Sequence, residues 1–275
     1  MPPIPTVILT PNGLEPAPYS VQSLPEAVPY EPSGVYTVAR TFHGDRALLF
    51  DAHLDRLEES ARLVNIPLRL DRARLRAALR DLLHEADYPD AKFRITVPRE
   101  HPECIYLALE PYQPVPQVVQ EQGAKVITVP MVRDNPVAKT TDWMTTRRPA
   151  YDSLPPDAYE GILVNGAGRL LEGLSSNFYG VLDGTLYTAS DRVLQGITRR
   201  AILTLAPEIL PVKLETLDLN DLPRLSEAML TSSGRGVVPI TTINGQPVGD
   251  GTVGPVVAAL RERYNRWTDT HAEPI

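Results

Sequence analysis

The sequence predicts an α+β protein of two domains, divided near residue 115. Runs of strand-forming residues and amphipathic helical segments follow one another without the strict alternation typical of a parallel α/β sheet. A proline-rich stretch, "PYQPVPQ" (111–117), separates two sets of such elements and is the best candidate linker. The chain has 275 residues, enough for two modest domains, so we expect a small one over 1–115 and a larger one over 119–275.

The first expected domain begins with a proline-rich, extended lead-in over residues 1–32. Two strand-like runs around the turn "HGD" then indicate a hairpin. The amphipathic segment "DAHLDRLEESARLV" follows and predicts a helix, which Asp51 is placed to cap. The hairpin strands, a second helix and two further strands are expected at 35–42, 46–50, 71–86, 92–98 and 104–109.

The second expected domain mixes strands with two helices. "GITRRAILTLA" (196–206) predicts a helix opened by Gly196, and "VGPVVAALRERYNRW" predicts a helix that closes the chain. The segment "TTINGQPV" contains an Asn-Gly pair typical of a hairpin. The strands are expected at 124–130, 160–165, "LLEGLSSNFYGVL", "TLYT" and 228–233.

Composition excludes several classes of function. A net charge of −7 argues against nucleic-acid binding, and no apolar run is long enough for a membrane helix. The N-terminal "MPPIPTVILTPNG" lacks the basic and apolar regions of a secretion signal. The single cysteine, Cys104, excludes an internal disulfide and fits a reducing compartment, so we expect a cytoplasmic protein.

Two charged residues lie in apolar surroundings. Glu172 stands between Leu171 and Gly173 in a strand-like run, either as a strand-edge carboxylate facing water or as a buried one that holds a proton on a heterocyclic nitrogen. Lys139 follows "NPVA" and is one of only four lysines. It is either a surface lysine or a desolvated amine able to attack a carbonyl.

Two segments have the form of anion sites. Gly196 precedes a helix whose first residues, Ile197 and Thr198, offer free N–H groups and a hydroxyl to a phosphate. The turn "TSSGRG" (231–236) is rich in hydroxyl groups and glycine, so its Ser232 and Ser233 extend the candidate phosphate site. Each segment alone is compatible with a plain helix start or a plain loop.

Together these residues resemble the class IV pyridoxal-phosphate enzymes, which include branched-chain aminotransferases, D-amino-acid aminotransferases and aminodeoxychorismate lyase. The resemblance covers the chain from about Gly34 and depends on "HLDRL", Lys139, "EGLSSN", "GITR" and the Ser-rich turn, in that order. It implies fold type IV, with a small N-terminal α/β sandwich, a larger C-terminal pseudo-barrel domain and the cofactor in the cleft between them.

The resemblance also assigns roles to residues. Lys139 would carry pyridoxal 5′-phosphate as a Schiff base and move the substrate proton, and Glu172 would hold the pyridinium proton. Arg56 would bind the phosphate with the helix start and the Ser-rich turn, because an arginine at a helix N-terminus suits a dianion. The implied cofactor-binding set is Arg56, Lys139, Glu172, Ser176, Asn177, Leu194, Gly196, Ile197, Thr198, Ser232 and Ser233.

Substrate residues are implied by the same resemblance. Tyr36 and Arg40 would line the pocket, and "REH" places Arg99 and His101 at the spacing of a carboxylate trap, against the alternative of a solvated loop. The full substrate-binding set is Tyr36, Arg40, Arg94, Arg99, His101, Gly234 and Arg235. Met144 stands where branched-chain enzymes have a tyrosine, so the phenolic oxygen of the cofactor needs another partner.

Three functions follow as expectations. The first is a transaminase that exchanges an amino group between a D-amino acid or branched-chain amino acid and a 2-oxo acid. The second is a lyase that releases pyruvate and 4-aminobenzoate from aminodeoxychorismate. The third is a non-catalytic cofactor-binding protein. The expected partners are small-molecule substrates, without nucleic acid, membrane or metal, and family members imply a homodimer.

Overall fold

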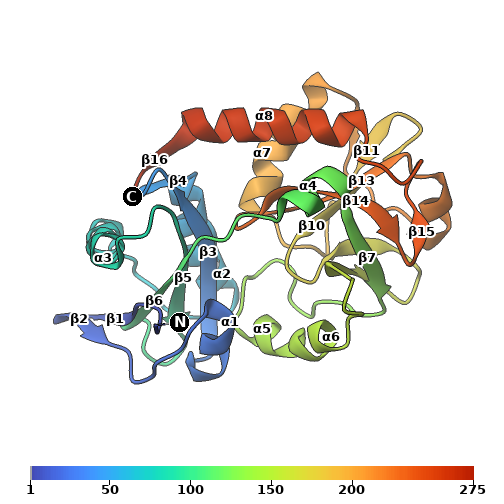
Figure 1. Ribbon diagram of the computed structural model, residues 1–275. Coiled ribbons are helices and arrows are strands. Elements are labelled where there is room, and N and C mark those ends of the chain that lie inside the picture. The colour runs from blue at the N-terminus through green and yellow to red at the C-terminus, as the bar shows by residue number, and fades with distance from the viewer. Residues whose placement is uncertain (1) are drawn as a thin grey trace. The chain divides into compact units, whose positions relative to one another are not determined.

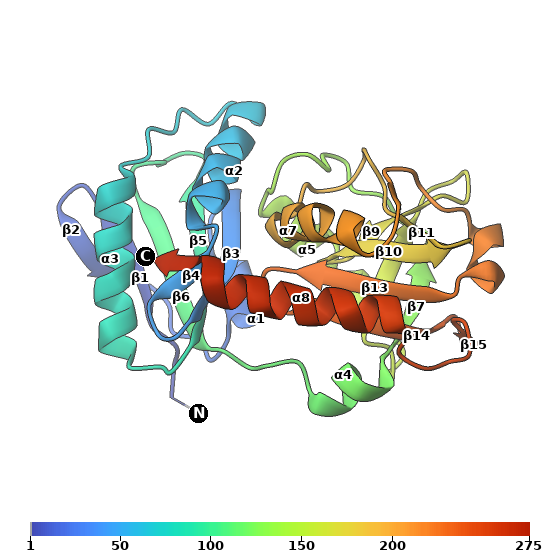
Figure 2. The same ribbon diagram turned by 90° about the horizontal axis from the view of Figure 1, so that it is seen from above.

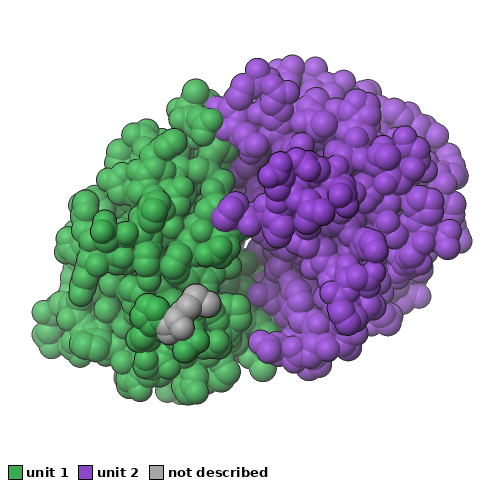
Figure 3. All heavy atoms as spheres, in the orientation of Figure 1, with its two compact units in different colours: residues 1–113, 138–146, 268–275 green, residues 114–137, 147–267 purple. Residues whose placement is uncertain are grey.

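The computed structural model describes residues 2–275, which form two compact units (Figure 1, Figure 3). Unit 1 comprises the described residues up to Gln113 together with Ala138–Thr146 and Thr268–Ile275, and unit 2 comprises Pro114–Val137 and Arg147–Trp267. The first boundary lies close to the expected one near 115. The division nevertheless differs from the contiguous domains 1–115 and 119–275, because two later segments return to unit 1.

Unit 1 is built on a seven-stranded sheet in which every pair is antiparallel. The hairpin expected around "HGD" is present, but its second strand is short because the chain turns into a helix at Phe50. In spatial order the strands are β16 (Ala272–Pro274), β4 (Arg46–Leu48), β3 (Gly34–Phe42), β5 (Ala91–Pro98), β6 (Ile105–Pro111), β1 (Thr6–Thr10) and β2 (Gly13–Pro16).

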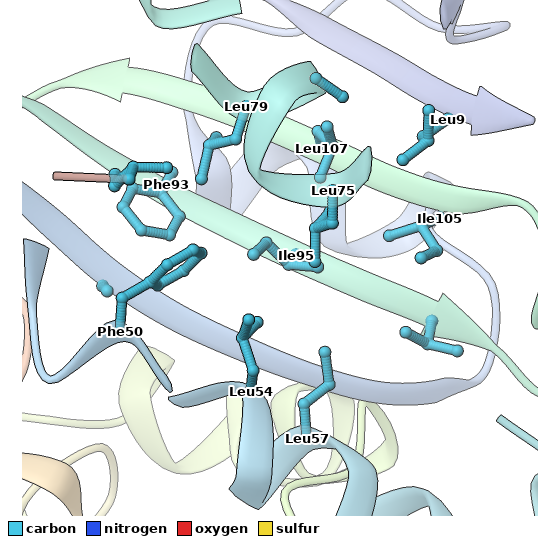
Figure 4. Packing of buried hydrophobic residues seen from close by; sticks show 14 of the residues in the cluster. Leu9, Phe50, Leu54, Leu57, Leu75, Leu79, Phe93, Ile95, Ile105 and Leu107 are labelled. Carbon is cyan, nitrogen blue, oxygen red and sulfur yellow. The ribbon is translucent and has the colours of Figure 1, made fainter. Parts of the chain in front are cut away.

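Two helices, α2 (Phe50–Leu63) and α3 (Arg72–Ala86), cover one face of this sheet (Figure 2). Leu54 of α2 and Leu75 of α3 pack with Phe93 and Ile95 of β5 in one core, as Figure 4 shows. The helical period brings one apolar stripe of each helix onto the sheet. Full burial of such a side chain contributes about 1.5–3 kcal/mol.

The other face of the sheet has a separate, smaller core. Leu24 and Ala27 of the short helix α1 (Leu24–Ala27) pack there with Ala108 of β6. Leu107 and Leu109, the neighbours of Ala108, belong to the first core, because successive side chains of a strand point to opposite faces. A 3₁₀ turn, η1 (Val28–Tyr30), follows α1.

Two local expectations for unit 1 are wrong. The lead-in is not merely extended: it contains β1, which pairs with β6, and the edge strand β2. Its prolines concealed these strands, although an edge strand tolerates proline. Asp51 does not cap α2, since the N-cap is Leu49 in a left-handed conformation; Asp51 lies in the first turn and forms an ion pair with Arg76.

Unit 2 contains a nine-stranded sheet that closes on itself. β9 pairs with both β8 and β10, so six strands form a ring in the order β10, β13, β14, β7, β8 and β9. Closure leaves these strands without open edges. The strands are β7 (Ala124–Val129), β8 (Glu160–Val164), β9 (Leu170–Gly173), β10 (Asn177–Leu182), β11 (Thr185–Tyr187), β12 (Val212–Lys213), β13 (Glu227–Ser232), β14 (Gly236–Ile243) and β15 (Gln246–Pro247).

The segment "LLEGLSSNFYGVL", expected as one strand, is two. It breaks at Leu174–Ser176, and β9 and β10 then pair so that Glu172 lies opposite Asn177. The small residues of "EGLSS" permit the reversal: a Cβ on Gly173 would lie 2.2 Å from the Ser176 hydroxyl oxygen. The turn therefore brings two candidate cofactor residues side by side.

Two of the remaining helices were expected from the sequence, and the shorter ones were not. α7 and α8 occur where expected, whereas α4 begins at Gln117, the last residue of the proline-rich segment assigned to the linker. No helix among the described residues is long and apolar enough to cross a membrane. The bounds are α4 (Gln117–Gln122), α5 (Asp142–Thr146), α6 (Arg148–Asp152), α7 (Ile197–Leu205), η2 (Ala206–Glu208), η3 (Leu219–Arg224) and α8 (Pro255–His271).

Candidate functional site

Lys139 belongs to unit 1, where its main chain is hydrogen-bonded to β3 and α2. The Tyr36 N–H donates to the Lys139 carbonyl at 2.9 Å, and the Lys139 N–H donates to the Ser60 hydroxyl at 3.0 Å. Thr140, the next residue, forms a β-bridge with Val35. The half-buried side chain places Nζ 4.5 Å from the centroid of the Tyr36 ring. Lys139 is therefore not an ordinary surface lysine.

Arg56 lies on α2 in the same unit, with only 7% of its surface exposed. Its Nη2 donates to the Thr37 hydroxyl at 3.2 Å, and that hydroxyl is also hydrogen-bonded to His53 Nδ1 at 2.8 Å. The Ser60 hydroxyl donates to the Arg56 carbonyl at 2.7 Å. The same serine thus contacts both Arg56 and Lys139, and the structure brings together two cationic residues that the sequence places far apart.

Two arginines expected to bind substrate already have partners. Arg94 is 4% exposed and forms an ion pair at 2.6 Å with Glu31, while its Nη2 also donates to the Leu24 carbonyl at 2.9 Å. Arg40 stacks over Phe42, with its central carbon 3.9 Å from the ring centroid. A buried pair and a stacked guanidinium are typical of structural residues.

The "REH" segment lies at the surface of unit 1. Arg99 is exposed and donates to the Val64 carbonyl at 2.8 Å, and the exposed His101 lies 3.3 Å from Glu103. Met144 is buried in α5, and its sulfur is 3.9 Å from Arg94 Nη1. Of the expected substrate residues in unit 1, Tyr36 is the one whose ring contacts Lys139.

Glu172 is buried in β9 of unit 2, with 4% of its surface exposed, so it is not a strand-edge carboxylate facing water. Its Oε2 accepts a hydrogen bond from the Leu194 N–H at 3.0 Å. Its Oε1 lies 4.0 Å from Nη1 of Arg133, which is equally buried. Arg133 was not identified from the sequence, because an arginine shortly before Lys139 belongs to no motif of its own.

Asn177 and Glu172 together hold the peptide of Leu194. Asn177 Nδ2 donates to the Leu194 carbonyl at 2.8 Å, while Glu172 accepts from the Leu194 N–H. A Cβ on Gly196 would lie 2.2 Å from Asn177 Oδ1, so only glycine fits there without displacing the amide. This arrangement fixes the loop that leads into α7.

The start of α7 has the features of an anion site. Its N-cap is Gly196, which makes no side-chain hydrogen bond to the first turn, and Ile197 and Thr198 are buried. The next residue, Arg199, is 4% exposed, and burial lowers the pKa of its guanidinium. Arg199 donates to Gln195 Oε1 and to the Ala189 carbonyl.

The Ser-rich turn joins β13 to β14 and is anchored by a buried carboxylate. Arg235 Nη1 is 2.5 Å from Oε2 of Glu160, a residue of β8 with no exposed surface. Arg235 Nε also donates to the Ser232 hydroxyl, and the Ser176 hydroxyl donates to Glu160 Oε1. Burial is the largest single influence on the pKa of Arg235 and lowers it, but the charge and hydrogen bond of Glu160, together with the nearby Tyr151 and Tyr159, raise this pKa above its ordinary value.

The remaining residues of this turn, Ser233 and Gly234, are half-buried. Ser176 and Arg235 both contact Glu160, so they belong to one network, although they lie in separate motifs of the sequence. Glu160 was not identified from the sequence. Its only signal is a charged residue at the start of the apolar run "EGILVN".

The donor groups fit a cofactor that carries an aldehyde, a phosphate and a basic ring nitrogen. Within unit 1 these groups are an amine and a guanidinium, which can react with an aldehyde and bind a phosphate. Unit 2, taken by itself, has a buried carboxylate, a helix start without a side-chain cap and a turn with hydroxyl groups, which can pair with a protonated ring nitrogen and bind a phosphate. Among residues 2–275 no group of three or more His, Cys, Asp and Glu side chains is arranged to hold a metal ion.

Comparison with known proteins gives consistent matches. A family model described as amino-transferase class IV matches residues 34–243. A D-alanine aminotransferase from Listeria monocytogenes serotype 4b is 30% identical over 251 residues, which cover 84% of this chain and 85% of that protein.

Solved structures confirm the expected fold. The branched-chain amino acid aminotransferase of Escherichia coli has a TM-score of 0.81 at 22% identity, covering 98% of this chain and 96% of that one. The branched-chain aminotransferase of the thermophilic archaeon Thermoproteus uzoniensis, solved with norvaline, has a TM-score of 0.81 at 18% identity and covers 99% of both chains. Another branched-chain amino acid aminotransferase of this fold was solved with pyridoxamine 5′-phosphate.

Proposed function

Because this chain belongs to the class IV aminotransferases, which use pyridoxal 5′-phosphate, we propose that it is a transaminase in which Lys139 binds the cofactor and moves the substrate α-proton. The observation that carries the proposal is the placement of Lys139. Hydrogen bonds from Tyr36 and to Ser60 fix its main chain close to Arg56, while its Nζ rests over an aromatic ring.

Lys139 has the chemistry for both roles. A primary amine can add to an aldehyde and, once displaced by the substrate amine, can take a proton from carbon and return it. The bound cofactor supplies the electron sink that makes the substrate α-proton acidic. The main chain of Lys139 is fixed, and its side chain contacts the Tyr36 ring. This arrangement suits an amine that must move a proton between nearby atoms.

Glu172 is proposed to hold the proton on the ring nitrogen. Its carboxylate is buried, and one oxygen is oriented by the Leu194 N–H. A buried carboxylate stabilises a neighbouring positive charge more strongly than an exposed one, because water does not screen the interaction. Arg133 Nη1 lies 4.0 Å from Glu172 Oε1, so a positive charge already stands beside this carboxylate.

Phosphate-binding roles are proposed for Arg56 in unit 1 and, in unit 2, for Ile197 and Thr198 at the start of α7 and for Ser232 and Ser233. A guanidinium can donate two parallel hydrogen bonds to a phosphate, and a helix N-terminus adds N–H donors and a positive partial charge. Arg56 is already oriented by Thr37, so less freedom is lost when an anion binds.

The amino donor is proposed to be a D-amino acid or a branched-chain amino acid, with a 2-oxo acid as acceptor. The D-alanine aminotransferase at 30% identity supports the first class. The branched-chain enzymes at 18% and 22% identity share the fold, and on that ground alone they support no choice of substrate. Tyr36, which contacts Lys139, is the residue proposed to shape the pocket beside the amine.

Borohydride reduction tests the assignment of Lys139. The purified protein is mixed with pyridoxal phosphate and reduced, and the modified peptide is identified by mass spectrometry. We expect modification of Lys139 and none in Lys139→Ala. Lys125→Ala, which removes an exposed lysine paired with Asp157, is the matched control and should keep the modification. Modification of another lysine, unchanged by Lys139→Ala, would contradict the assignment.

A substrate panel tests the reaction. D-Alanine and L-leucine are offered in turn without an acceptor, while the conversion of the cofactor to the pyridoxamine form is followed by absorbance. 2-Oxoglutarate is then added, and it should return the cofactor to the aldehyde form. One of the two donors should convert the cofactor, and the active donor identifies the substrate class. If neither donor does so and aminodeoxychorismate yields 4-aminobenzoate, the lyase reaction replaces the proposal.

A further inference from the structure

Ser60 makes two hydrogen bonds that link the lysine segment to the arginine helix. It is fully buried on α2, one turn after Arg56. Its hydroxyl donates to the Arg56 carbonyl at 2.7 Å and accepts from the Lys139 N–H at 3.0 Å. The second bond joins residues 79 positions apart in the chain. One side-chain oxygen therefore connects the main chains of two proposed cofactor residues.

The chemistry of a hydroxyl is required at this position. A serine inside a helix often donates to the carbonyl four residues earlier, and this bond alone does not stabilise the helix. Here the same oxygen also accepts from outside the helix, and a hydroxyl is among the few small groups that can donate and accept together. Alanine can do neither, and its presence would leave the Lys139 N–H without this partner.

Lys139 is held on both sides of its Cα atom. The Tyr36 N–H of β3 donates to its carbonyl, while its own N–H donates to Ser60 of α2. On the same strand, the Thr37 hydroxyl accepts from the Arg56 guanidinium. Ser60 therefore links α2, which carries Arg56, to the segment of Lys139, and this segment is also hydrogen-bonded to β3.

We propose that Ser60 is a positioning residue that sets the separation between the Lys139 amine and the Arg56 guanidinium, so that one ligand engages both. The inference rests on the proposed function of these two residues. When a ligand binds at two points, the second contact is favoured only if both points are already at the right separation. A ligand that binds at one point does not depend on that separation.

Three ligands distinguish a positioning role of Ser60 from a general role in stability. Pyridoxal phosphate uses both the amine and the phosphate site, pyridoxal lacks the phosphate, and pyridoxamine phosphate lacks the aldehyde. The affinity of cofactor-free protein for each is measured by equilibrium dialysis, with Ser60→Ala compared to wild type. We expect about a tenfold loss for pyridoxal phosphate, the scale of one lost buried hydrogen bond, and less than about threefold for the other two.

Thr204→Ala is the matched control. Thr204 donates to the carbonyl of Arg200 four residues earlier, but on an exposed part of α7. This variant should leave all three affinities unchanged. Equal losses for the three ligands in Ser60→Ala, or no loss for pyridoxal phosphate, would overturn the role of Ser60. Absence of a covalent bond to Lys139 in wild type would instead overturn the proposed function.

Hydrogen–deuterium exchange gives a readout that needs no ligand and no turnover. Peptides covering residues 138–141 are compared between cofactor-free wild type and Ser60→Ala. The bond to Ser60 protects the Lys139 N–H, so its removal should speed exchange in this segment while peptides from β5 stay unchanged. Faster exchange throughout unit 1 would show that Ser60 supports the fold in general, and would contradict a specific positioning role.

Discussion

Lys139 of unit 1 and Glu172 of unit 2 are held in opposite ways. The main chain of Lys139 is fixed, by the Tyr36 N–H and by Ser60, and its amine contacts an aromatic face. For Glu172 the carboxylate itself is held, by the Leu194 N–H and close to Arg133. A group that transfers a proton must move, whereas a group that stabilises a charge must stay oriented. The contrast matches the two proposed roles.

A second contrast separates buried charges that support the fold from those proposed to act. The Arg94–Glu31 pair of unit 1 is close and is completed by Thr96, which donates to Glu31. The Glu172–Arg133 contact of unit 2 is longer, at 4.0 Å. Burial and charge are shared by both pairs. The partners and distances of each pair therefore distinguish a buried charge that supports the fold from one that is proposed to act in catalysis.

The largest expected effect comes from breaking the structural pair. Arg94→Met removes a buried guanidinium and leaves the Glu31 carboxylate buried without its ion-pair partner. Loss of one partner of such a pair destabilises a protein by about 3–5 kcal/mol. We expect a loss of this size in urea denaturation, with an unchanged KM for the 2-oxo acid under conditions where the variant stays folded.

Arg99→Met is the control for Arg94→Met, because it removes an exposed guanidinium that donates to the Val64 carbonyl; it should cost less than about 0.5 kcal/mol. Replacing Glu31 by leucine in the Arg94→Met background should restore part of the stability. A raised KM without a loss of stability would show instead that Arg94 binds substrate, as the sequence predicts.

The next effect concerns catalysis. Glu172→Gln keeps the shape of the side chain and removes its charge, so a protonated ring nitrogen loses its proposed partner. Removing a single charge-stabilising group from an active site lowers the rate by about 10²–10³-fold. We expect a fall of this size in single-turnover transamination, while the affinity for pyridoxamine phosphate changes little.

Glu227→Gln gives the comparison within unit 2. Glu227 is also a buried carboxylate, but it accepts from the N–H groups of Val256 and Val257 at the start of α8. Its loss should reduce stability and leave the single-turnover rate unchanged. An equal fall in rate for both variants would mean that burial of a carboxylate, and not the position of Glu172, explains the effect.

The smallest effect distinguishes the two ends of the proposed cofactor site. Thr37→Val removes the hydroxyl that accepts from the Arg56 guanidinium. Loss of such a bond changes binding by about fivefold. Pyridoxal phosphate and pyridoxamine phosphate should both bind about this much more weakly, because both depend on Arg56, whereas pyridoxal should be unaffected.

Thr41→Val is the control on the same face of β3. Thr41 is also fully buried, but its hydroxyl accepts from the Ala91 N–H within the sheet. Thr41→Val should lower the stability of the protein, and any change in affinity should be the same for all three ligands. If Thr37→Val weakens pyridoxal as much as the phosphorylated ligands, the proposed role of Thr37 in orienting the phosphate arginine is wrong.

Local signals predicted most of the secondary structure. The apolar spacing of α2, α3 and α7 and the strand-like runs of β5 and β8 placed these elements within a few residues of their observed bounds. The proline-rich first segment failed because its strands gain their hydrogen bonds from β6, far along the chain. The same limit hid the break between β9 and β10, where closure of the sheet requires a turn.

The sequence by itself determined the types of most elements and the residues able to do the chemistry, because helical and strand periods and motif spacing are local properties. Only the tertiary structure decided the partners of those residues. It paired Arg94 with Glu31 and Arg235 with Glu160, and it placed Arg133 beside Glu172. It also joined Ser60 to Lys139. These contacts depend on how distant segments pack, and no local pattern encodes that geometry.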